Sequence, residues 1–163
     1  MKRESYFCLL NQETKHMASR RIEDLHPYLA AAYKKTAAEF DIAFPGLSKP
    51  FITCTYRSKE EQNDLFSQGR TKPGNKITNA KGGESLHNYY PSYAFDIAFV
   101  SGKEGKIDWS EDLFKKFAGI FCRNQCLEWG GNWKTFKDTP HFGFKGFKWQ
   151  DAAIGKCPKM NEV

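Results

Sequence analysis

The sequence predicts an α+β fold in which helices pack on a small antiparallel sheet. Three observations favour this class: segments with apolar residues at helical spacing, short segments that alternate β-branched and aromatic residues, and a C-terminal run of aromatic segments broken by glycine and proline. The chain of 163 residues contains no internal repeat and no low-complexity linker. We therefore expect one globular domain over residues 1–163.

A first helix is expected from His26 and Pro27 to about residue 40. Proline is tolerated at the first helical position because its missing N–H would have no partner there. The apolar residues that recur at intervals of three and four are Tyr28, Leu29, Ala32, Tyr33, Ala37 and Phe40. This spacing predicts that one face of the helix packs against the core.

The alternation in Phe51–Arg57 predicts a half-buried strand that leads directly into a second helix. Ser58, with Glu61 three residues later, forms a capping-box pattern at the start of that helix, and Gly69 ends it. Arg57 is therefore expected at a strand-to-helix junction.

The second half of the chain begins with a loop and ends with short strands. Residues 70–84 are polar and contain Pro-Gly and Gly-Gly pairs, so we expect a long loop, and loops of that length are often functional. A strand is expected over residues 94–100, and Ser110 is expected to cap a helix with an apolar face. Residues 127–149 are typical of a meander of short antiparallel strands.

The net charge of +6 and the pI near 9.0 indicate attraction to polyanions. Because lysine and arginine are scattered along the chain, we expect a solvated basic surface and no nucleic-acid partner. No stretch approaches the roughly 18 to 20 apolar residues of a membrane span. The N-terminus, MKRESYFCLLNQETK, has no small-residue cleavage site, so a secretory signal is not expected.

The five cysteines are an odd number and include no C-x-x-C pair. A disulfide framework or a cysteine zinc site is therefore not expected, and the thiols are interpreted as reduced and mostly buried. Cys54 precedes Arg57 on the expected strand. Strand alternation places it with Ile52 and Tyr56 on an inner face, so we interpret it as an inert core thiol rather than a nucleophile.

Two of the four histidines lie near carboxylates in surroundings rich in glycine and proline. His87 precedes Asp96 by nine positions, and His141 follows Asp138 in the segment Asp-Thr-Pro-His. Taken separately, each pair is more often a buried hydrogen-bonding pair than a reactive site. The other two histidines, His16 and His26, are interpreted as surface or capping residues.

Taken together, His87, Asp96 and His141 supply the three nitrogen or oxygen ligands that a catalytic zinc ion needs, with a fourth position open for water. Asp138 is a further carboxylate three residues before a ligand, where it can take a proton from water and pass it to a leaving amine. Asp96 lies at a position where the strand pattern predicts an apolar residue. A nearby cation would offset the free-energy cost of burying its charge there. The alternative is that Asp96 lies on the solvent face of the strand.

Three motifs occur in a fixed order along the chain. They are Tyr56-Arg57-Ser58, then Ser85-x-His87 with Ala94-x-Asp96, then Glu128-Trp129-Gly130-Gly131-x-Trp133-x-x-Phe136-x-Asp138-x-Pro140-His141-Phe142. Together they resemble the zinc-dependent D-alanyl-D-alanine carboxypeptidase superfamily, peptidase family M15, and within it the L-alanyl-D-glutamate peptidases used as bacteriophage endolysins. The resemblance covers about residues 20–147 and implies a Hedgehog/DD-peptidase-like zinc peptidase fold.

The resemblance also implies a role for each site residue. His87, Asp96 and His141 match the ligands of Zn²⁺, Asp138 matches the catalytic acid/base, and Arg57 matches the arginine that steadies the substrate carbonyl oxygen. The permanent charge of a guanidinium suits a growing oxyanion, and a well-aimed donor there is worth roughly 3 to 4 kcal/mol.

Two positions depart from the family pattern. The segment between His87 and Asp96 is two residues longer than usual and lacks the family glycine. A longer loop must therefore bring Asp96 back to the metal site. Gly143 stands where relatives often carry an acidic or polar residue, which affects the substrate subsites rather than the metal.

The implied function is zinc-dependent hydrolysis of the L-alanyl-D-glutamate bond in the stem peptide of peptidoglycan, an acidic polymer that suits a basic protein. A D-alanyl-D-alanine carboxypeptidase with the same metal site is one alternative. A non-catalytic wall-binding module on the same fold is another, although the presence of Asp138 and Arg57 argues against it.

The resemblance further implies a biological setting. The protein is expected to be a monomeric bacteriophage lysis enzyme without a separate wall-binding domain. It would wait in the host cytoplasm until the membrane is opened and would then act on the cell wall as a bacteriolytic, antimicrobial enzyme.

Overall fold

The computed structural model of the protein describes residues 18–102 and 104–161. The expectations for the N-terminal segment, including Cys8 and His16, lie outside these residues. The helices and strands in chain order are η1 (Ile22–Asp24), α1 (Pro27–Ala43), β1 (Lys49–Cys54), α2 (Lys59–Ser67), η2 (Leu86–Asn88), β2 (Ala94–Val100), β3 (Ile107–Asp108), α3 (Glu111–Phe121), β4 (Leu127–Trp129), η3 (Gly130–Asn132), β5 (His141–Phe144) and α4 (Trp149–Ala153).

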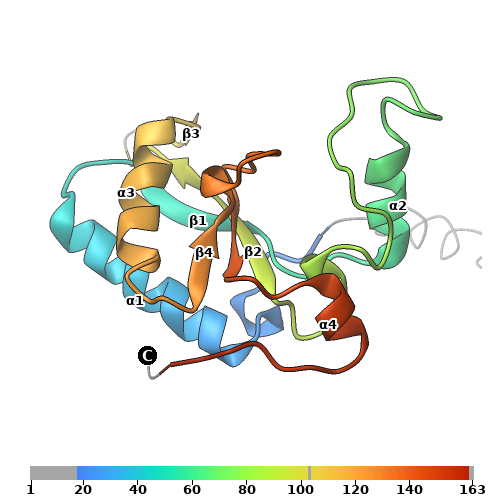
Figure 1. The fold of residues 1–163 in the computed structure, drawn as a ribbon. Helices are drawn as coiled ribbons and strands as arrows, with labels where there is room; N and C mark the ends of the chain where they lie inside the picture. The colour runs from blue at the N-terminus through green and yellow to red at the C-terminus, as the bar shows by residue number, and fades with distance from the viewer. Residues whose placement is uncertain (1–17, 103, 162–163) are drawn as a thin grey trace, which may run out of the picture.

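The sheet has five strands in the order β1-β2-β5-β4, with every neighbouring pair antiparallel (Figure 1). The fifth strand, β3, pairs with the C-terminal end of β2, whereas β5 pairs with its N-terminal end. Strand β2 therefore has β1 along one edge and β5 and β3 along the other. This central position brings residues from both ends of the chain next to β2.

Helices α1 and α3 lie together over one face of the sheet (Figure 1). Alternate residues of β2 pack against them: the ring of Phe95 lies 5.6 Å from Phe121, and that of Phe99 lies 5.0 Å from Phe114 and 5.6 Å from Phe40. Because side chains alternate along a strand, the residues between them point to the other face. Asp96 is one of these residues.

Helix α2 and the loop of residues 70–84 lie on the side away from α1 and α3 (Figure 1). The Oγ of Ser58 accepts a hydrogen bond from the Glu61 N–H at 3.1 Å, which caps the helix as predicted. Gly69 follows the helix with φ +68°, a conformation that favours glycine. Arg57 lies in the short connection between β1 and α2, as the sequence predicts.

Most of the predicted elements are confirmed, but their details differ: the strand predicted over Phe51–Arg57 is β1 at Lys49–Cys54, and two further elements depart from the prediction. Ser110 is the N-cap residue of α3, yet its side chain makes no capping hydrogen bond; its N–H instead donates to Oδ1 of Asp108 at 2.9 Å. The meander predicted for residues 127–149 contains only β4 and β5, and it leads into a helix, α4, that the aromatic pattern did not indicate. Glycine and proline signals mark breaks in the chain but do not say what lies between them.

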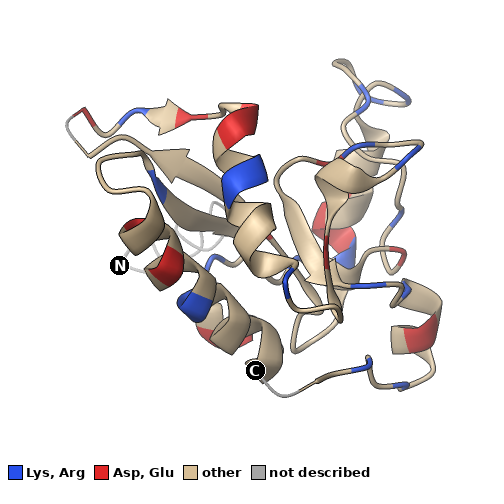
Figure 2. Cartoon of the chain, turned by 60° about the vertical axis from the view of Figure 1, so that its left-hand side comes forward, with Lys and Arg blue, Asp and Glu red and all other residues tan. Residues whose placement is uncertain are grey.

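Cysteine burial is also less complete than predicted. Among the described residues all four cysteines are free, but only Cys54 is buried; Cys122 and Cys126 are half-buried, and Cys157 is exposed. Lysine and arginine positions are distributed over helices and loops in Figure 2, with acidic positions between them. No helix within the described residues has the length and apolar character needed to cross a membrane.

Candidate functional site

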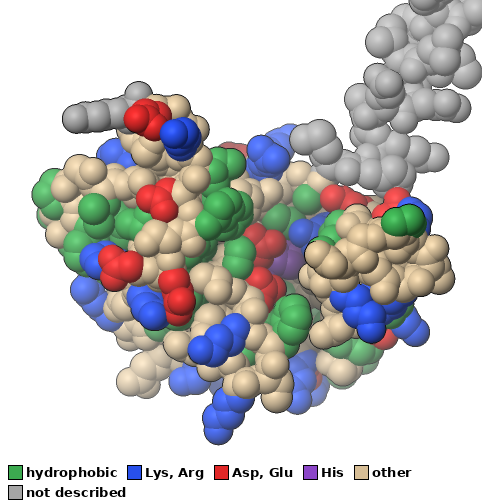
Figure 3. Space-filling view, turned by 90° about the horizontal axis from the view of Figure 1, so that it is seen from above, with side chains coloured by type: hydrophobic (Ala, Val, Ile, Leu, Met, Phe, Trp, Pro, Cys, Tyr) green, Lys and Arg blue, Asp and Glu red, His purple; other side chains and the backbone are tan. Residues whose placement is uncertain are grey.

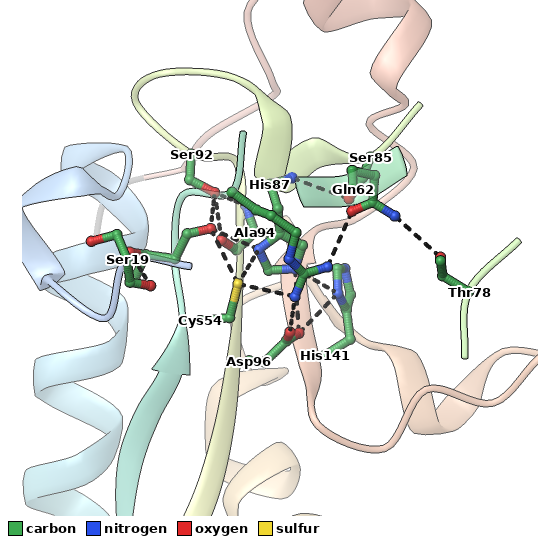
Figure 4. Close-up of polar contacts among 12 residues, drawn as sticks. Ser19, Cys54, Gln62, Thr78, Ser85, His87, Ser92, Ala94, Asp96 and His141 are labelled. Carbon is green, nitrogen blue, oxygen red and sulfur yellow. Dashed lines mark hydrogen bonds and ion pairs between the residues drawn. The ribbon is translucent and has the colours of Figure 1, made fainter. Parts of the chain in front are cut away.

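Three metal-ligand atoms meet on the face of the sheet opposite α1 and α3 (Figure 4). Oδ1 of Asp96 lies 3.3 Å from Nε2 of His87 and 3.3 Å from Nδ1 of His141. The two ring nitrogens are themselves 3.3 Å apart. The three atoms therefore form a triangle with equal sides.

Strand register brings two of these residues together. Asp96 of β2 lies directly opposite His141 of β5 and opposite Cys54 of β1. Residues that face each other across antiparallel strands point to the same side of a sheet. His87 reaches the same place from η2, where Oγ of Ser85 accepts a hydrogen bond from its N–H at 3.4 Å.

A hydrogen bond to the backbone orients the imidazole of His87. Nδ1 of His87 lies 2.7 Å from the carbonyl oxygen of Thr55, and this oxygen also accepts from Oγ of Ser92 at 3.0 Å. A carbonyl only accepts, so Nδ1 carries the proton. In the neutral ring the lone pair is therefore on Nε2, the atom that faces Asp96.

The carboxylate of Asp96 and the ring nitrogens of His87 and His141 favour a positive charge between them. Oδ1 of Asp96 is buried and has no hydrogen-bond partner among the described residues. Burial acts to raise the pKa of Asp96, but the positive charge of His87 and the close approach of His87 and His141 outweigh it and hold that pKa well below its ordinary value. Burial acts to lower the pKa of His87, but the charge of Asp96 outweighs it and raises that pKa well above its ordinary value. The carboxylate thus stays ionised, and positive charge beside it is favoured, whether a proton on the imidazole or a bound cation supplies it.

The triangle fits a tetrahedral metal ion. Zinc binds nitrogen and oxygen ligands at about 2.0 to 2.1 Å, and a tetrahedron of that size places its ligand atoms about 3.3 to 3.4 Å apart. The distances among His87, Asp96 and His141 match this spacing. Three protein ligands leave one position open, which is the arrangement of catalytic rather than structural zinc sites.

Cys54 lies behind this triangle. Its sulfur is 3.6 Å from Nδ1 of His87, and Cys54, His87 and Asp96 also form a group with metal-ligand spacing. The Nδ1 of His87 is already used by Thr55, so a cation held by this imidazole would be bound through Nε2, on the side of His141. The sequence identified Cys54 as a buried thiol, but its predicted place on the same face as Ile52 is wrong. A register shift between the two residues pairs Ile52 with Ile97 of the core and Cys54 with Asp96 of the site.

The guanidinium of Arg57 lies beside the triangle. Its Nη1 donates to Oε1 of Gln62 at 3.1 Å, and its Nη2 donates to the sulfur of Cys54 at 3.3 Å. Nη2 is also 3.8 Å from Oδ2 of Asp96. Its Nε is buried without a hydrogen-bond partner in the described part of the chain. The guanidinium thus keeps donor capacity at the site.

Asp138 is held by a tight turn before β5. Its N–H donates to the Gly130 carbonyl at 3.1 Å, and its own carbonyl accepts from the His141 N–H at 3.1 Å. A Cβ on Gly130 would lie only 2.5 Å from the Asp138 carbonyl oxygen, so this approach requires glycine. Burial, followed by the charge of Asp96, raises the pKa of Asp138 against the opposing charge of His141. A raised pKa makes the ionised carboxyl a stronger base, which suits a group that accepts and returns a proton.

These residues open into a cleft of about 700 Å³. Figure 3 shows histidine and acidic side chains at the floor of a hollow between two parts of the surface. The loop around Thr78 forms one wall and Trp133 with Phe136 another, and residues 147–150 complete the lining. The ring of Trp133 packs on His141 at 5.0 Å, so one wall directly contacts a candidate ligand.

Known relatives place this site in a family. A family model described as D-alanyl-D-alanine carboxypeptidase matches residues 78–144. The peptidoglycan L-alanyl-D-glutamate endopeptidase CwlK of Bacillus subtilis (strain 168) is 40% identical over 132 residues, covering 72% of this chain and 72% of CwlK. The chain belongs to peptidase family M15. The crystal structure of the L-Ala D-Glu endopeptidase ChiX of Serratia marcescens shares the fold, with a TM-score of 0.54 and 20% identity over 82% of this chain and 94% of ChiX.

As an M15 peptidase the protein is a hydrolase, and peptidases of this family use a metal ion. The family match spans His87, Asp96, Asp138 and His141, whereas Arg57 precedes it. The structure brings all five predicted site residues to one cleft. The predicted capping role of His26 is confirmed, since its Nδ1 accepts from the Tyr28 N–H at 3.3 Å.

Sequence reasoning missed three contributions to the site. These are the Thr55 carbonyl, the sulfur of Cys54 and the amide of Gln62. A backbone carbonyl leaves no signal in a sequence. Gln62 stands five residues after Arg57 in a polar helix, where nothing in its type or spacing distinguishes it from a surface glutamine.

Proposed function

We propose that this M15 peptidase is a zinc enzyme that hydrolyses the L-alanyl-D-glutamate bond of the peptidoglycan stem peptide. The observation that carries the proposal is the triangle of His87, Asp96 and His141, with ligand atoms 3.3 Å apart at the floor of a cleft. The bond is proposed from the 40% identity to a peptidoglycan L-alanyl-D-glutamate endopeptidase.

The donor set favours zinc over magnesium and calcium. Two imidazoles and one carboxylate form a site of nitrogen and oxygen ligands, whereas magnesium and calcium sites consist of oxygen ligands alone. When bound, a zinc ion supplies a Lewis acid that polarises a carbonyl and lowers the pKa of water toward about 7.

The protein's own residues would then complete the reaction. Asp138 accepts a proton as the oxygen of water bonds to the scissile carbonyl carbon, and it returns that proton to the amine as the C–N bond breaks. Arg57 carries a permanent positive charge beside the ligands and donates to the carbonyl oxygen as negative charge grows there. The walls of the cleft exclude water and orient the peptide.

A second candidate function is supported by the family match itself. The matching family model is described as D-alanyl-D-alanine carboxypeptidase, and the same metal site and acid/base residue would serve that reaction. The two functions differ in which end of the stem peptide enters the cleft. A non-catalytic wall-binding role needs neither Asp138 nor Arg57, and both line the cleft.

We further propose the setting in which the enzyme acts. A bacteriophage lysis enzyme would reach the wall from the host cytoplasm once the membrane is opened, and its activity there would be bacteriolytic. The net charge of +6 would hold the protein near the acidic wall polymer. We propose a monomer with a single domain over residues 1–163 and no nucleic-acid partner.

Digestion of purified peptidoglycan with and without a chelator tests the function. Mass analysis of the new termini is expected to find free N-terminal D-glutamate, which disappears with the chelator and returns with added zinc. Released D-alanine would support the carboxypeptidase instead. The absence of cleavage by the zinc-loaded protein would contradict both functions.

A further inference from the structure

A buried glutamine links the candidate active site to one wall of the cleft. Gln62 lies on α2 and is only 1% exposed, which is unusual for an uncharged polar side chain of its length. It lines the cleft together with Arg57 and Thr78. A buried amide is stable only when its donors and acceptor are used, so its partners are informative.

Both ends of the Gln62 amide are hydrogen-bonded (Figure 4). Oε1 accepts from Nη1 of Arg57 at 3.1 Å. Nε2 donates to the carbonyl oxygen of Ala80 at 2.9 Å and to Oγ1 of Thr78 at 3.3 Å. A guanidinium only donates and a carbonyl only accepts, so these partners fix which end of the amide is oxygen. The side chain therefore bridges Arg57 and the loop.

The loop rests on α2 through further contacts that do not involve Arg57. Oδ1 of Asn63 accepts from the Gly82 N–H at 2.8 Å, and a Cβ on Gly82 would lie 2.3 Å from the Lys59 carbonyl oxygen. Nη1 of Arg70 donates to the Thr78 carbonyl at 3.0 Å. Gln62 is thus one of several residues that dock the loop, and the one that also contacts Arg57.

The other contacts of Arg57 explain why this link matters. Among the described residues, the other contacts of its guanidinium are with the Cys54 sulfur, a weak acceptor, at 3.3 Å and with the Asp96 carboxylate at 3.8 Å. Without Oε1 of Gln62, the nearest strong acceptor of the guanidinium would be the carboxylate of a candidate metal ligand. A long side chain has many rotamers, so losing a fixed acceptor lets the guanidinium leave its productive position.

We propose that Gln62 is a positioning residue: it holds the guanidinium of Arg57 at the reacting centre and makes that position depend on the docked loop of residues 77–82. This inference rests on the proposed role of Arg57 in the peptidase reaction. Contact between substrate and the loop is then coupled to stabilisation of the carbonyl oxygen. Within the described residues the Gln62 side chain bonds to Arg57, Thr78 and Ala80 and not to His87, Asp96 or His141, so its proposed effect on the reaction passes through Arg57.

Four variants test the proposal with a soluble stem peptide, L-alanyl-γ-D-glutamyl-L-lysine, as substrate. Gln62→Met keeps the length of the side chain but removes all three hydrogen bonds. Gln62→Glu keeps an acceptor for Arg57 but loses both donors to the loop. Asn63→Ala is the matched control, because it removes a neighbouring amide that docks the same loop without touching Arg57. Arg57→Ala reports on the residue through which Gln62 would act.

We expect Gln62→Met to lower kcat by at least about tenfold while zinc content stays at the wild-type level. Complete removal of an oxyanion donor lowers kcat by a factor of about 10² to 10³, and a misplaced donor should cost part of that factor. Gln62→Glu keeps the acceptor for Arg57 but not the link to the loop, so it is expected to recover only part of kcat and to raise KM. Asn63→Ala is expected to raise KM with kcat close to wild type. If Gln62→Met lowers kcat no more than Asn63→Ala does, the proposal is overturned.

A double-mutant cycle separates this proposal from the proposed function. If Gln62 acts through Arg57, Gln62→Met in the Arg57→Ala background has little further effect on kcat. Equal losses in both backgrounds would overturn the positioning role while leaving the role of Arg57 intact. An Arg57→Ala variant as active as wild type would instead overturn the role of Arg57. Should Gln62→Met fail to fold, the same cycle with Gln62→Glu gives the answer.

Discussion

Asp96 of β2 lies directly opposite His141 of β5, and Oδ1 of the carboxylate is 3.3 Å from Nδ1 of the imidazole. The neighbouring pair in the same register, Phe95 and Phe142, points to the opposite face and stacks in the core at 5.7 Å. One strand pair therefore builds the site on one face and the core on the other. A change of register by one residue would exchange the two faces.

The roles of the ligands and of Asp138 are distinguished by metal content. We expect Asp138→Ala to keep bound zinc but to lower kcat by a factor of about 10² to 10⁴, because only proton transfer is removed. We expect His141→Ala to lose both zinc and activity. Metal analysis of the purified variants, alongside peptide hydrolysis, measures both. Loss of zinc from Asp138→Ala would show that Asp138 is a ligand instead.

Removal of the metal is expected to destabilise the fold. Because the ligands come from η2, β2 and β5, an ion bound only by the folded state holds these elements together. With free zinc at 100 to 1,000 times Kd, the stabilisation is about 3 to 4 kcal/mol. Thermal unfolding with and without a chelator should differ by on the order of 10 °C. An unchanged Tm would count against a bound ion at this place.

Gly130 is expected to be essential for the position of Asp138. The Cβ of Gly130→Ala would lie 2.5 Å from the Asp138 carbonyl oxygen and 3.1 Å from Cβ of His141, so the turn must move. We expect this variant to lose at least about tenfold in kcat, since small displacements of catalytic groups are costly. Peptide hydrolysis and thermal unfolding measure the effect.

Gly119 provides the matched control for that experiment. It lies within α3, and a Cβ there would meet nothing within 4 Å. Gly119→Ala is therefore expected to leave kcat unchanged and to stabilise the protein by about 0.5 to 1 kcal/mol. Equal activity of Gly130→Ala and Gly119→Ala would contradict the argument from the tight turn.

Lys148 is expected to favour substrates with a free carboxylate. It is exposed, lines the cleft, and has no hydrogen bond or ion pair from its ammonium to any residue that the structure describes. Lys148→Ala should raise KM by up to about fivefold for a glutamyl substrate, the range of exposed ion pairs. The KM for a substrate with that carboxyl amidated should not change.

Lys145→Ala is the control for Lys148, because Lys145 is exposed but does not line the cleft. It removes the same charge three residues away. An equal rise in KM for both variants, or for both substrates, would indicate a general effect of net charge rather than contact with the carboxylate.

Cysteine reactivity is expected to follow burial. Burial raises the pKa of the Cys122 thiol to about 11. A raised pKa means less thiolate at a given pH, so at pH 8 only about one thousandth of Cys122 is in the reactive form. Cys157, which is exposed, should therefore be alkylated well before Cys122. Peptide mass mapping over time checks the order, and prior labelling of Cys122 would contradict it.

Much of the fold could be predicted because its local signals are strong. The strand at residues 94–100 is confirmed at both ends, and the apolar spacing up to Phe40 lies within α1. The helix α4 and the short strand β3 could not be predicted, because segments of five and two residues are too short to show a period. Their existence depends on the neighbours against which they lie.

The candidate site was predictable in its residues but not in its geometry. His87, Asp138 and His141 could be selected from their chemical types, their neighbours and the resemblance of the motifs. The equal spacing of three ligand atoms and the proton position on His87 depend on strand register and on the Thr55 carbonyl, which no residue type encodes. The inert interpretation of Cys54 was incomplete for the same reason, since its contacts come from other elements.

The amino-acid sequence by itself determined which side chains can bind a metal, exchange a proton or stabilise an anion, and where along the chain the longer helices and strands form. Both depend on chemical type and short-range spacing. The tertiary structure brings the ligand atoms of Asp96, His141 and His87 close together. It also places Gln62 between Arg57 and the loop of residues 77–82. Those relationships join residues dozens of positions apart. They arise only when strand pairing and burial of the aromatic core select one register out of many.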